Sequence, residues 1–190
     1  MLWLRFLIAN LRTKVDRIET LTLGGGCFWC TEAVYENVIG VFSVESAYSG
    51  GNYENPNYQA ICTGTTGHAE VIKITYDPEQ IDMEELLDIF WVIHDPTTLN
   101  QQGADKGTQY RSVIFYETPQ QQEIALASIE KAQANFSEKI VTEVSPLINY
   151  YPAEGYHQHY FANNPQQGYC QAVVAPKVEK FKTHFSEMQK

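Results

Sequence analysis

The cysteines at positions 27 and 30 lie three residues apart in the stretch GGGCFWCTEA, directly after three glycines. The thiolate is the nucleophilic form of cysteine, and a free thiol with a pKa of about 8.5 provides only a few per cent of it at neutral pH. A helix that begins here would place Cys27 at its N-terminus, where unpaired backbone N–H groups favour the anion and lower the thiol pKa. We therefore expect Cys27 to be a reactive nucleophile rather than a small buried apolar residue.

A Cys-x-x-Cys pair at a helix start is also typical of a thioredoxin-like dithiol or of half a zinc site. Zinc needs two further ligands, and neither Cys-x-x-Cys nor His-x-x-x-His occurs elsewhere in the chain, so we expect no metal. A thioredoxin-like dithiol normally has a pair such as Gly-Pro or Pro-His between its cysteines. Here Phe28 and Trp29 form a bulky apolar pair, which favours a site that receives an apolar group beside the thiol.

Charge and composition limit the classes of partner. The formal net charge of −10 argues against a nucleic acid or an anionic membrane surface. The N-terminal run MLWLRFLIAN is interrupted by Arg5, and no apolar run approaches the roughly 18 residues that a membrane-spanning helix needs. Four cysteines in 190 residues do not form the dense pattern of a secreted disulfide scaffold, so we expect a cytoplasmic protein.

The elements that must position these residues follow from periodicity and from turn residues. Strands are expected over 21–23, 42–48, 69–78, 111–117 and 140–148, and helices over 27–40, 81–94, 119–136, around 156–161 and over 178–185. Asp82 is the expected N-cap of one helix, and Pro119 lies near the first position of the next. The polar segments 52–68 and 97–110 are expected to be long loops, which are usually functional or disordered.

Strands occur in this order both in pairs and in alternation with helices. Such an order favours an α+β fold, a two-layer sandwich in which helices pack on one face of a mixed or antiparallel sheet. Neither repeats nor a linker divides the chain, so we expect a single catalytic domain over residues 21–190 after an N-terminal extension over residues 1–20.

Four motifs, GGGCFWCTEA, CTGTTGHAE, GTQYRS and GYC, occur in this order between about residues 21 and 185. Together they resemble the A-type peptide methionine sulfoxide reductases. The resemblance implies a two-layer α+β sandwich related to the ferredoxin-like folds. It also implies that Cys27 is the nucleophile, that Phe28 and Trp29 hold the S-methyl group of the substrate, and that Glu70 is the acid.

The same resemblance assigns further residues of the site. Tyr58 and Tyr110 are expected to donate hydrogen bonds to the sulfoxide oxygen, with Asp105 as a supporting carboxylate. Tyr169 is expected to close the pocket, although a structural role fits it equally well. A thiolate attacks a sulfoxide readily only if the oxygen leaves as hydroxide or water, so we expect burial to keep Glu70 protonated as the proton donor.

The reaction leaves Cys27 as a sulfenic acid, which a second thiol converts to a disulfide. Glycine usually follows Gly-Cys-Phe-Trp in the family, whereas this chain has Cys30 there and also keeps Cys170 in the GYC segment. Cys170 lies on a Gly- and Asn-rich segment that could swing in, and it is the first candidate resolving cysteine. Cys30 is within reach of Cys27 on a helix and is the second candidate, and direct reduction of Cys27 by an external thiol is the remaining alternative. Cys62 is expected to pack rather than react.

The implied activity is thiol-dependent reduction of methionine S-sulfoxide, free or in proteins, as antioxidant protein repair. The implied reductant is thioredoxin, or dithiothreitol in vitro, with no bound cofactor and with the chain acting as a monomer. Two other functions compete with this one. A general dithiol oxidoreductase would keep its activity after Glu70→Gln, and a redox-sensing module would capture oxidised methionine without releasing methionine.

Overall fold

The computed structural model describes residues 18–190, so residues 1–17 of the expected extension lie outside the described part. The strands are β1 (Glu19–Gly25), β2 (Val41–Ser49), β3 (Ala69–Tyr76), β4 (Gln101–Gln102), β5 (Asp105–Lys106), β6 (Ser112–Tyr116), β7 (Glu143–Pro146) and β8 (Tyr151–Pro152). The α-helices are α1 (Phe28–Tyr35), α2 (Tyr58–Cys62), α3 (Met83–Ile93), α4 (Pro119–Gln133), α5 (Tyr160–Asn163) and α6 (Ala175–His184). Short 3₁₀ turns are η1 (Thr108–Tyr110), η2 (Gly155–His157) and η4 (Ser186–Met188), and η3 (Cys170–Val174) is a turn of π-helix.

Six strands form one sheet in the order β7-β6-β1-β3-β2-β8. All neighbouring strands are antiparallel except β6 and β7, which are parallel. β4 and β5 form a separate small hairpin. The sheet is therefore mixed, as the order of elements predicts.

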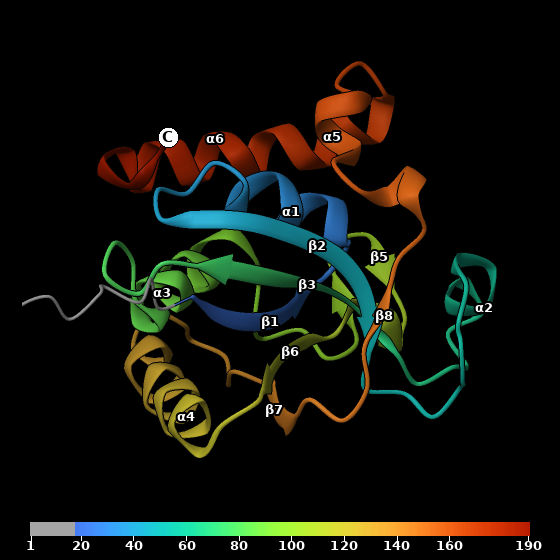
Figure 1. Cartoon of the computed structure of the whole chain (residues 1–190), viewed down its shortest axis with the longest axis horizontal. Helices are drawn as coiled ribbons and strands as arrows, with labels where there is room; N and C mark the ends of the chain where they lie inside the picture. The colour runs from blue at the N-terminus through green and yellow to red at the C-terminus, as the bar shows by residue number, and fades with distance from the viewer. Residues whose placement is uncertain (1–17) are drawn as a thin grey trace, which may run out of the picture.

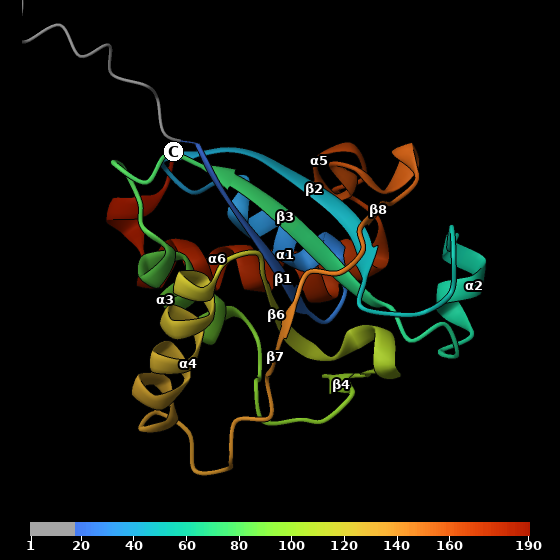
Figure 2. The same cartoon turned by 60° about the horizontal axis from the view of Figure 1, so that its bottom comes forward.

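Helices α1, α3 and α6 pack on one face of this sheet, and α4 packs beside α3 (Figures 1 and 2). Side chains of β3 alternate between the two faces: Ile72 and Ile74 belong to the large core under the helices, and Val71 belongs to a smaller cluster on the other face. Leu147 and Tyr150 pack on that smaller cluster instead of a second helical layer. The predicted two-layer α+β sandwich is confirmed.

Local signals in the sequence explain where two of the helices begin. The Asp82 side chain accepts from the Glu85 N–H, and the Glu85 side chain accepts from the Asp82 N–H, which is a complete capping box for α3. Helix α4 begins at Pro119, and the Thr118 hydroxyl accepts from the Gln121 N–H. Both predicted helix starts are correct.

The two polar segments contain more structure than we expect from their composition. Helix α2 lies within 52–68, where the Asn57 side chain caps it by accepting from the Ala60 N–H at 2.9 Å. The hairpin β4–β5 and the turn η1 lie within 97–110. The first helix is also shorter than predicted, because it ends at Tyr35.

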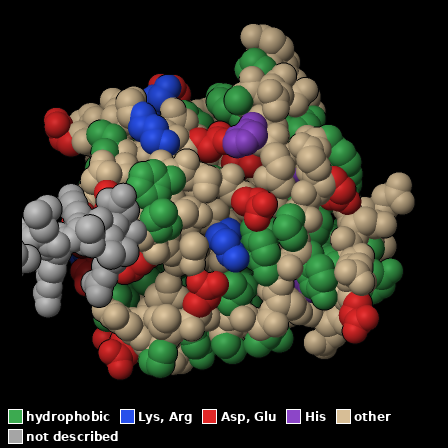
Figure 3. All heavy atoms as spheres, viewed as in Figure 1, with side chains coloured by type: hydrophobic (Ala, Val, Ile, Leu, Met, Phe, Trp, Pro, Cys, Tyr) green, Lys and Arg blue, Asp and Glu red, His purple; other side chains and the backbone are tan. Residues whose placement is uncertain are grey.

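Within residues 18–190, none of the helices is both long enough and apolar enough to cross a membrane. On the face shown in Figure 3, acidic side chains are spread among a few Lys and Arg side chains. No broad basic patch is visible on that face, which agrees with the net charge of −10.

Candidate active site

Three glycines carry the chain from β1 into α1. A Cβ on Gly24 would lie 2.8 Å from Cγ1 of Val113 and 2.9 Å from the carbonyl oxygen of Glu70, so only glycine lets the strand lie this close to its neighbours. Gly26 has φ +93°, a conformation that other residues rarely adopt. This turn places Cys27 at the N-cap of α1.

Cys27 is only 8% exposed. Its hydrogen bond to the Cys30 sulfur raises the pKa of the Cys27 thiol well above the ordinary value, and burial and the Glu70 carboxyl raise it further. The backbone N–H of Trp29 acts in the opposite direction but does not outweigh them. The expected low pKa of Cys27 is therefore wrong, because the thiol is buried, faces a carboxyl group and donates a hydrogen bond to a neighbouring sulfur.

Cys30 is the partner whose pKa is lowered. The hydrogen bond from Cys27 is the main cause, and the positive charge of Lys177 adds to it. Cys30 is buried in the first turn of α1, and its own N–H donates to the Cys27 carbonyl oxygen at 3.1 Å. The hydrogen bond between the two cysteines thus raises the pKa of Cys27 and lowers the pKa of Cys30.

Glu70 lies at the start of β3, on the face that the helices cover, and it is 2% exposed. Its Oε2 accepts a hydrogen bond from the Phe28 N–H, the first backbone donor of α1, at 3.1 Å. Burial raises the pKa of Glu70 to about 8, against the opposing effect of that hydrogen bond. The expected rise in the pKa of Glu70 is present, so this carboxyl is mostly protonated at neutral pH.

Two phenols face the same place from different loops. Tyr58 begins α2 and Tyr110 ends η1, and both side chains are half-buried. Burial raises the pKa of each phenol. The hydrogen bond with Cys62 adds to this rise for Tyr58, and the charges of Glu70 and Cys27 raise the pKa of both phenols further. Both hydroxyls therefore remain protonated hydrogen-bond donors, and both lie close enough to Cys27 and Glu70 to interact with their charges.

Asp105 and Tyr169 meet at another side of the site. The Tyr169 hydroxyl donates to Oδ2 of Asp105 at 2.6 Å, which joins the hairpin β4–β5 to the chain just before Cys170. Asp105 also raises the pKa of Glu70 through its charge. The predicted catalytic residues of five separate segments thus lie within interaction range of one another: Cys27, Tyr58, Glu70, Asp105 and Tyr110.

The two aromatic residues between the cysteines have different surroundings. Phe28 is buried, with its ring 5.7 Å from the ring of Tyr48. Trp29 is half-buried and stacks on Tyr160 with ring centroids 3.7 Å apart, while Tyr169 approaches it edge-on at 5.9 Å. Trp29 is thus the more accessible of the two rings.

His157 is the residue of this region to which the sequence assigns no role. Its Nδ1 accepts from the indole N–H of Trp29 at 3.1 Å, and its ring lies 5.1 Å from Phe28 and 4.5 Å from Tyr58. The high aromatic content of the segment after Tyr150 is the only sequence signal that points toward it.

The structure differs from what we expect for the two remaining cysteines, Cys170 and Cys62. Cys170 is fully buried in the π-helical turn that leads directly into α6, so the segment that carries it is not the loose chain we expect. Burial and the charge of Cys30 raise the pKa of Cys170, which places the two sulfurs near each other. Cys62 is exposed, and the expectation that it packs is wrong, because Ile61 is the residue that α2 buries.

Among residues 18–190, one group of side chains has ligand atoms close enough together to hold a metal ion, namely Glu32, Glu36 and His159. It contains no cysteine and none of the site residues described above. Glu32 already accepts from the Ser46 hydroxyl at 3.2 Å, and Glu36 bonds to His159.

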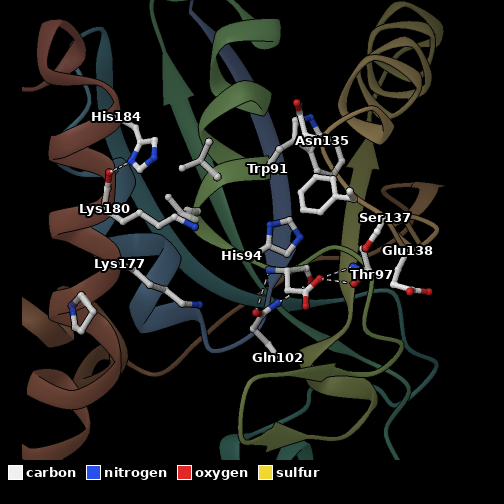
Figure 4. Close-up of a pocket in the computed structure, with 15 residues that line it drawn as sticks. Trp91, His94, Thr97, Gln102, Asn135, Ser137, Glu138, Lys177, Lys180 and His184 are labelled. Carbon is white, nitrogen blue, oxygen red and sulfur yellow. Dashed lines mark hydrogen bonds between the residues drawn. The ribbon is translucent and has the colours of Figure 1, made fainter.

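A groove of about 860 Å³ lies between the C-terminal end of α3, helix α6 and residues 135–138 (Figure 4). Lys177 and Lys180 extend into it from α6, and neither Cys27 nor Glu70 lines it. The groove is thus separate from the cysteine site, although the charge of Lys177 reaches Cys30.

A buried cysteine pair, a protonated carboxylic acid and two phenol donors on an α+β sandwich define a thiol-dependent oxidoreductase. The sequence profile described as "Peptide methionine sulfoxide reductase" matches residues 19–189. The chain belongs to this family. It is therefore an enzyme that reduces methionine sulfoxide with thiols and acts in protein repair.

Relatives and solved structures agree with this assignment. The chain is 55% identical over 169 residues to "Peptide methionine sulfoxide reductase MsrA" of Leptospira borgpetersenii serovar Hardjo-bovis, covering 88% of this chain and 96% of that one. Among solved structures it is similar to Mxr1 from Saccharomyces cerevisiae in reduced form, with a TM-score of 0.75, 38% identity and coverage of 81% of this chain and 90% of that one. Mxr1 in complex with Trx2 matches with a TM-score of 0.54 and 25% identity over 80% of this chain and 91% of that one.

Proposed function

We propose that Cys27 is the nucleophile that attacks the sulfur of methionine S-sulfoxide and that Glu70 is the acid that protonates its oxygen. The observation that carries this proposal is the buried Glu70 carboxyl, whose pKa is raised to about 8 and whose Oε2 accepts from the N–H of the residue after Cys27. An ionised carboxylate could not donate a proton to the oxygen, whereas this acid is protonated at neutral pH.

Tyr58 and Tyr110 complete the reaction site as donors to the sulfoxide oxygen. Charge develops on that oxygen as the sulfur–oxygen bond breaks, so fixed donors there lower the barrier. The Cys27 proton passes to Cys30, its hydrogen-bonded partner, as the Cys27 sulfur attacks. The attack joins the Cys27 sulfur to the substrate sulfur, and the protonated oxygen leaves as hydroxide. Attack of this hydroxide on the Cys27 sulfur then breaks the sulfur–sulfur bond, so methionine is released and Cys27 becomes a sulfenic acid.

Cys30 is the resolving cysteine that we propose first. It is already hydrogen-bonded to Cys27, and its pKa is the one that is lowered. Its sulfur attacks the Cys27 sulfur, a disulfide forms, and the hydroxyl leaves as water after taking up the remaining thiol proton. Cys170 lies near Cys30 and serves as the alternative, by direct attack on Cys27 or by exchange with the disulfide.

Thioredoxin is the reductant that we propose for this disulfide, since a dithiol must supply the electrons and the similar yeast Mxr1 has a structure in complex with Trx2. Dithiothreitol replaces it in vitro. The proposed cycle uses no bound cofactor and takes both oxidised proteins and free methionine S-sulfoxide as substrates. We further propose that the domain over residues 21–190 acts as a monomer in the cytoplasm, where thiols stay reduced.

Incubation of the purified protein with dithiothreitol and each methionine sulfoxide epimer tests the proposal, with chiral analysis of the remaining sulfoxide. Consumption of the S epimer alone by the wild-type protein, and no consumption by Cys27→Ser, is the expected result. Consumption of neither epimer by a protein that still reduces insulin disulfides would show that GGGCFWC is a general dithiol site.

A further inference from the structure

We infer that the groove between α3 and α6 receives an acidic segment of an oxidised protein substrate while the methionine sulfoxide of that protein lies at the cysteine site. This inference rests on the proposed function and specifies its substrate class, namely polypeptides with aspartate or glutamate a few positions from the oxidised methionine. Free methionine sulfoxide is too short to occupy both places, so it serves as the reference substrate.

One wall of the groove is a cationic face of α6. Lys177, Lys180 and His184 are three and four residues apart, so they lie on one face of the helix, and all three line the groove. In Figure 4 the ammonium ends of Lys177 and Lys180 point into the groove. Among residues 18–190, neither ammonium group forms a hydrogen bond or an ion pair.

The nearby carboxylates do not neutralise this wall. Asp95 lines the groove, but its Oδ1 accepts from the N–H and the hydroxyl of Thr97, at 2.9 Å and 2.6 Å. Glu138 is exposed on the opposite rim, and its carboxylate points away from the lysines in Figure 4. Glu179 of α6 accepts from Lys182 at 3.3 Å. A ligand with negative charge would therefore supply the partner that the α6 wall lacks.

The other walls suit a polypeptide better than a small anion. The groove is open to solvent, and its volume of about 860 Å³ is far more than one carboxylate or phosphate ion fills. Phe136 is half-buried and gives an apolar surface opposite α6. Asn135 and Ser137 flank it, both are exposed, and neither side chain forms a hydrogen bond within residues 18–190. An amide and a hydroxyl in these positions can bind the N–H and C=O groups of an extended chain.

The groove borders the cysteine site at two points. Gln102 lines the groove, and a Cβ on Gly26, the residue before Cys27, would lie 2.6 Å from Cγ of Gln102. On the α6 side, the charge of Lys177 acts on Cys30. A charge acts strongly only within about a Debye length, roughly 10 Å, which about three extended residues span. A chain whose oxidised methionine lies at Cys27 can thus place a residue about three positions away in the groove.

Short synthetic peptides that differ only in charge test this inference. Each has a central methionine S-sulfoxide among Gly and Ser residues, with a run of Asp, of the isosteric neutral Asn or of Lys on one side of it. With dithiothreitol as the reductant, we expect the wild-type KM to be about threefold lower for the Asp peptide than for the Asn peptide, and highest for the Lys peptide. This preference should disappear as the salt concentration rises from about 0.02 M to about 0.5 M.

Lys180 is the residue to replace, because the charge of Lys177 also acts on Cys30. Lys180→Met should abolish the preference for the Asp peptide, and Lys180→Glu should reverse it in favour of the Lys peptide. Both variants should keep the wild-type kcat and KM for free methionine S-sulfoxide. Lys182→Met is the matched control, since it removes the same charge from the same helix outside the groove and should keep the preference.

Binding without turnover is measured by fluorescence anisotropy of the labelled peptides in a Cys27→Ser background. The Asp peptide should bind more tightly than the Asn peptide, and Lys180→Met should remove the difference. Because this measurement needs no reduction, a wild-type protein that reduces no sulfoxide would contradict the proposed function, and the anisotropy would still decide whether the groove binds an acidic chain.

Three results would overturn the inference. The first is an equal KM for the Asp, Asn and Lys peptides. The second is an equal loss of the preference in Lys180→Met and Lys182→Met, which would assign it to the general field of α6. The third is an unchanged peptide preference in Lys180→Met together with a higher KM for thioredoxin when free methionine S-sulfoxide is the substrate, which would show that the groove receives the reductant.

Discussion

Replacement of Glu70 by glutamine tests the proton donor while the shape of the pocket is retained. The two side chains have nearly the same size, and an amide oxygen can still accept from the Phe28 N–H, which lies 3.1 Å from Oε2 of Glu70. The variant loses only the transferable proton. General acid catalysis typically contributes about 10²- to 10⁴-fold, so we expect kcat for methionine S-sulfoxide to decrease by about 10²-fold or more, with little change in KM.

Glu70→Gln should lower kcat, but it should raise the stability of the folded protein at alkaline pH. Burial raises the pKa of Glu70 from an ordinary 4.5 to about 8, so between these pH values the folded protein binds a proton that the unfolded chain has released. The free energy of unfolding then decreases as pH rises, by about 1.4 kcal/mol for each pKa unit and by about 5 kcal/mol in all. Glutamine does not titrate, so Glu70→Gln should lack this decrease and be more stable than the wild type above pH 8.

Urea unfolding at a series of pH values measures the stability effect, and steady-state kinetics with dithiothreitol measure the catalytic one. Stability should be compared in a Cys27→Ser background, because the charge of Glu70 raises the pKa of Cys27. Glu123→Gln on α4 is the matched control, since Glu123 is exposed and both properties should stay at the wild-type level. A wild-type kcat in Glu70→Gln, or a constant stability difference between the two proteins from about pH 5 to about pH 9, would refute the reasoning.

Further substitutions, two of them controls, test other parts of the structure. Cys30→Ser should release one methionine per protein but form a disulfide with Cys27 much more slowly than Cys170→Ser does, because Cys170 is only the alternative resolving thiol. Intact mass spectrometry over time distinguishes the two variants, and equal rates would contradict the proposed order. Lys177→Met should raise the pKa of Cys30, because the positive charge of Lys177 lowers that pKa in the wild-type protein. Ultraviolet absorbance of the thiolate, followed against pH, measures this pKa. An unchanged titration in the variant would contradict the prediction. Gly26→Ala should lower the free energy of unfolding by about 1–3 kcal/mol in urea, because φ is +93° and a Cβ would lie 2.6 Å from a neighbouring side chain. Gly155→Ala has no atom within 4 Å of the added methyl, and an equal loss there would contradict this explanation.

The elements that the sequence predicts well are those whose signals are local. The alternation of β3 and the cap of α3 at Asp82 depend on residues a few positions apart, and both appear as expected. Helix α2 escapes prediction because it has a single buried residue, Ile61, and depends on the Asn57 cap rather than on an apolar face. The π-helical start at Cys170 escapes it because the Gly-Asn-Pro composition before it is typical of a loop.

The candidate site also contains features that local sequence signals predict and features that they do not. Motif spacing identifies Cys27 and Glu70, but the contact between Trp29 and His157 spans 128 positions in the chain and no periodicity reports it. The sequence also does not predict the pKa of a thiol, because that pKa depends on which groups face the sulfur after folding. A helix N-terminus predicts a low pKa for Cys27, whereas Cys30 and Glu70 produce the reverse in the folded protein.

The N-terminus of α1 explains how one short turn serves both an acid and a nucleophile. Its first N–H, from Phe28, donates to Glu70, and the next, from Trp29, lowers the pKa of Cys27. Burial outweighs the Phe28 donor at Glu70, and the hydrogen bond to Cys30 together with burial outweighs the Trp29 donor at Cys27, so the pKa of each group is raised. In the proposed reaction the acid and the nucleophilic thiol are therefore both protonated at the start, and Cys30 accepts the thiol proton. A site whose acid and nucleophile are both neutral can admit the neutral, polar sulfoxide without burying an additional charge. In the proposed reaction Cys30 would therefore act twice, first as the proton acceptor and then as the resolving thiol.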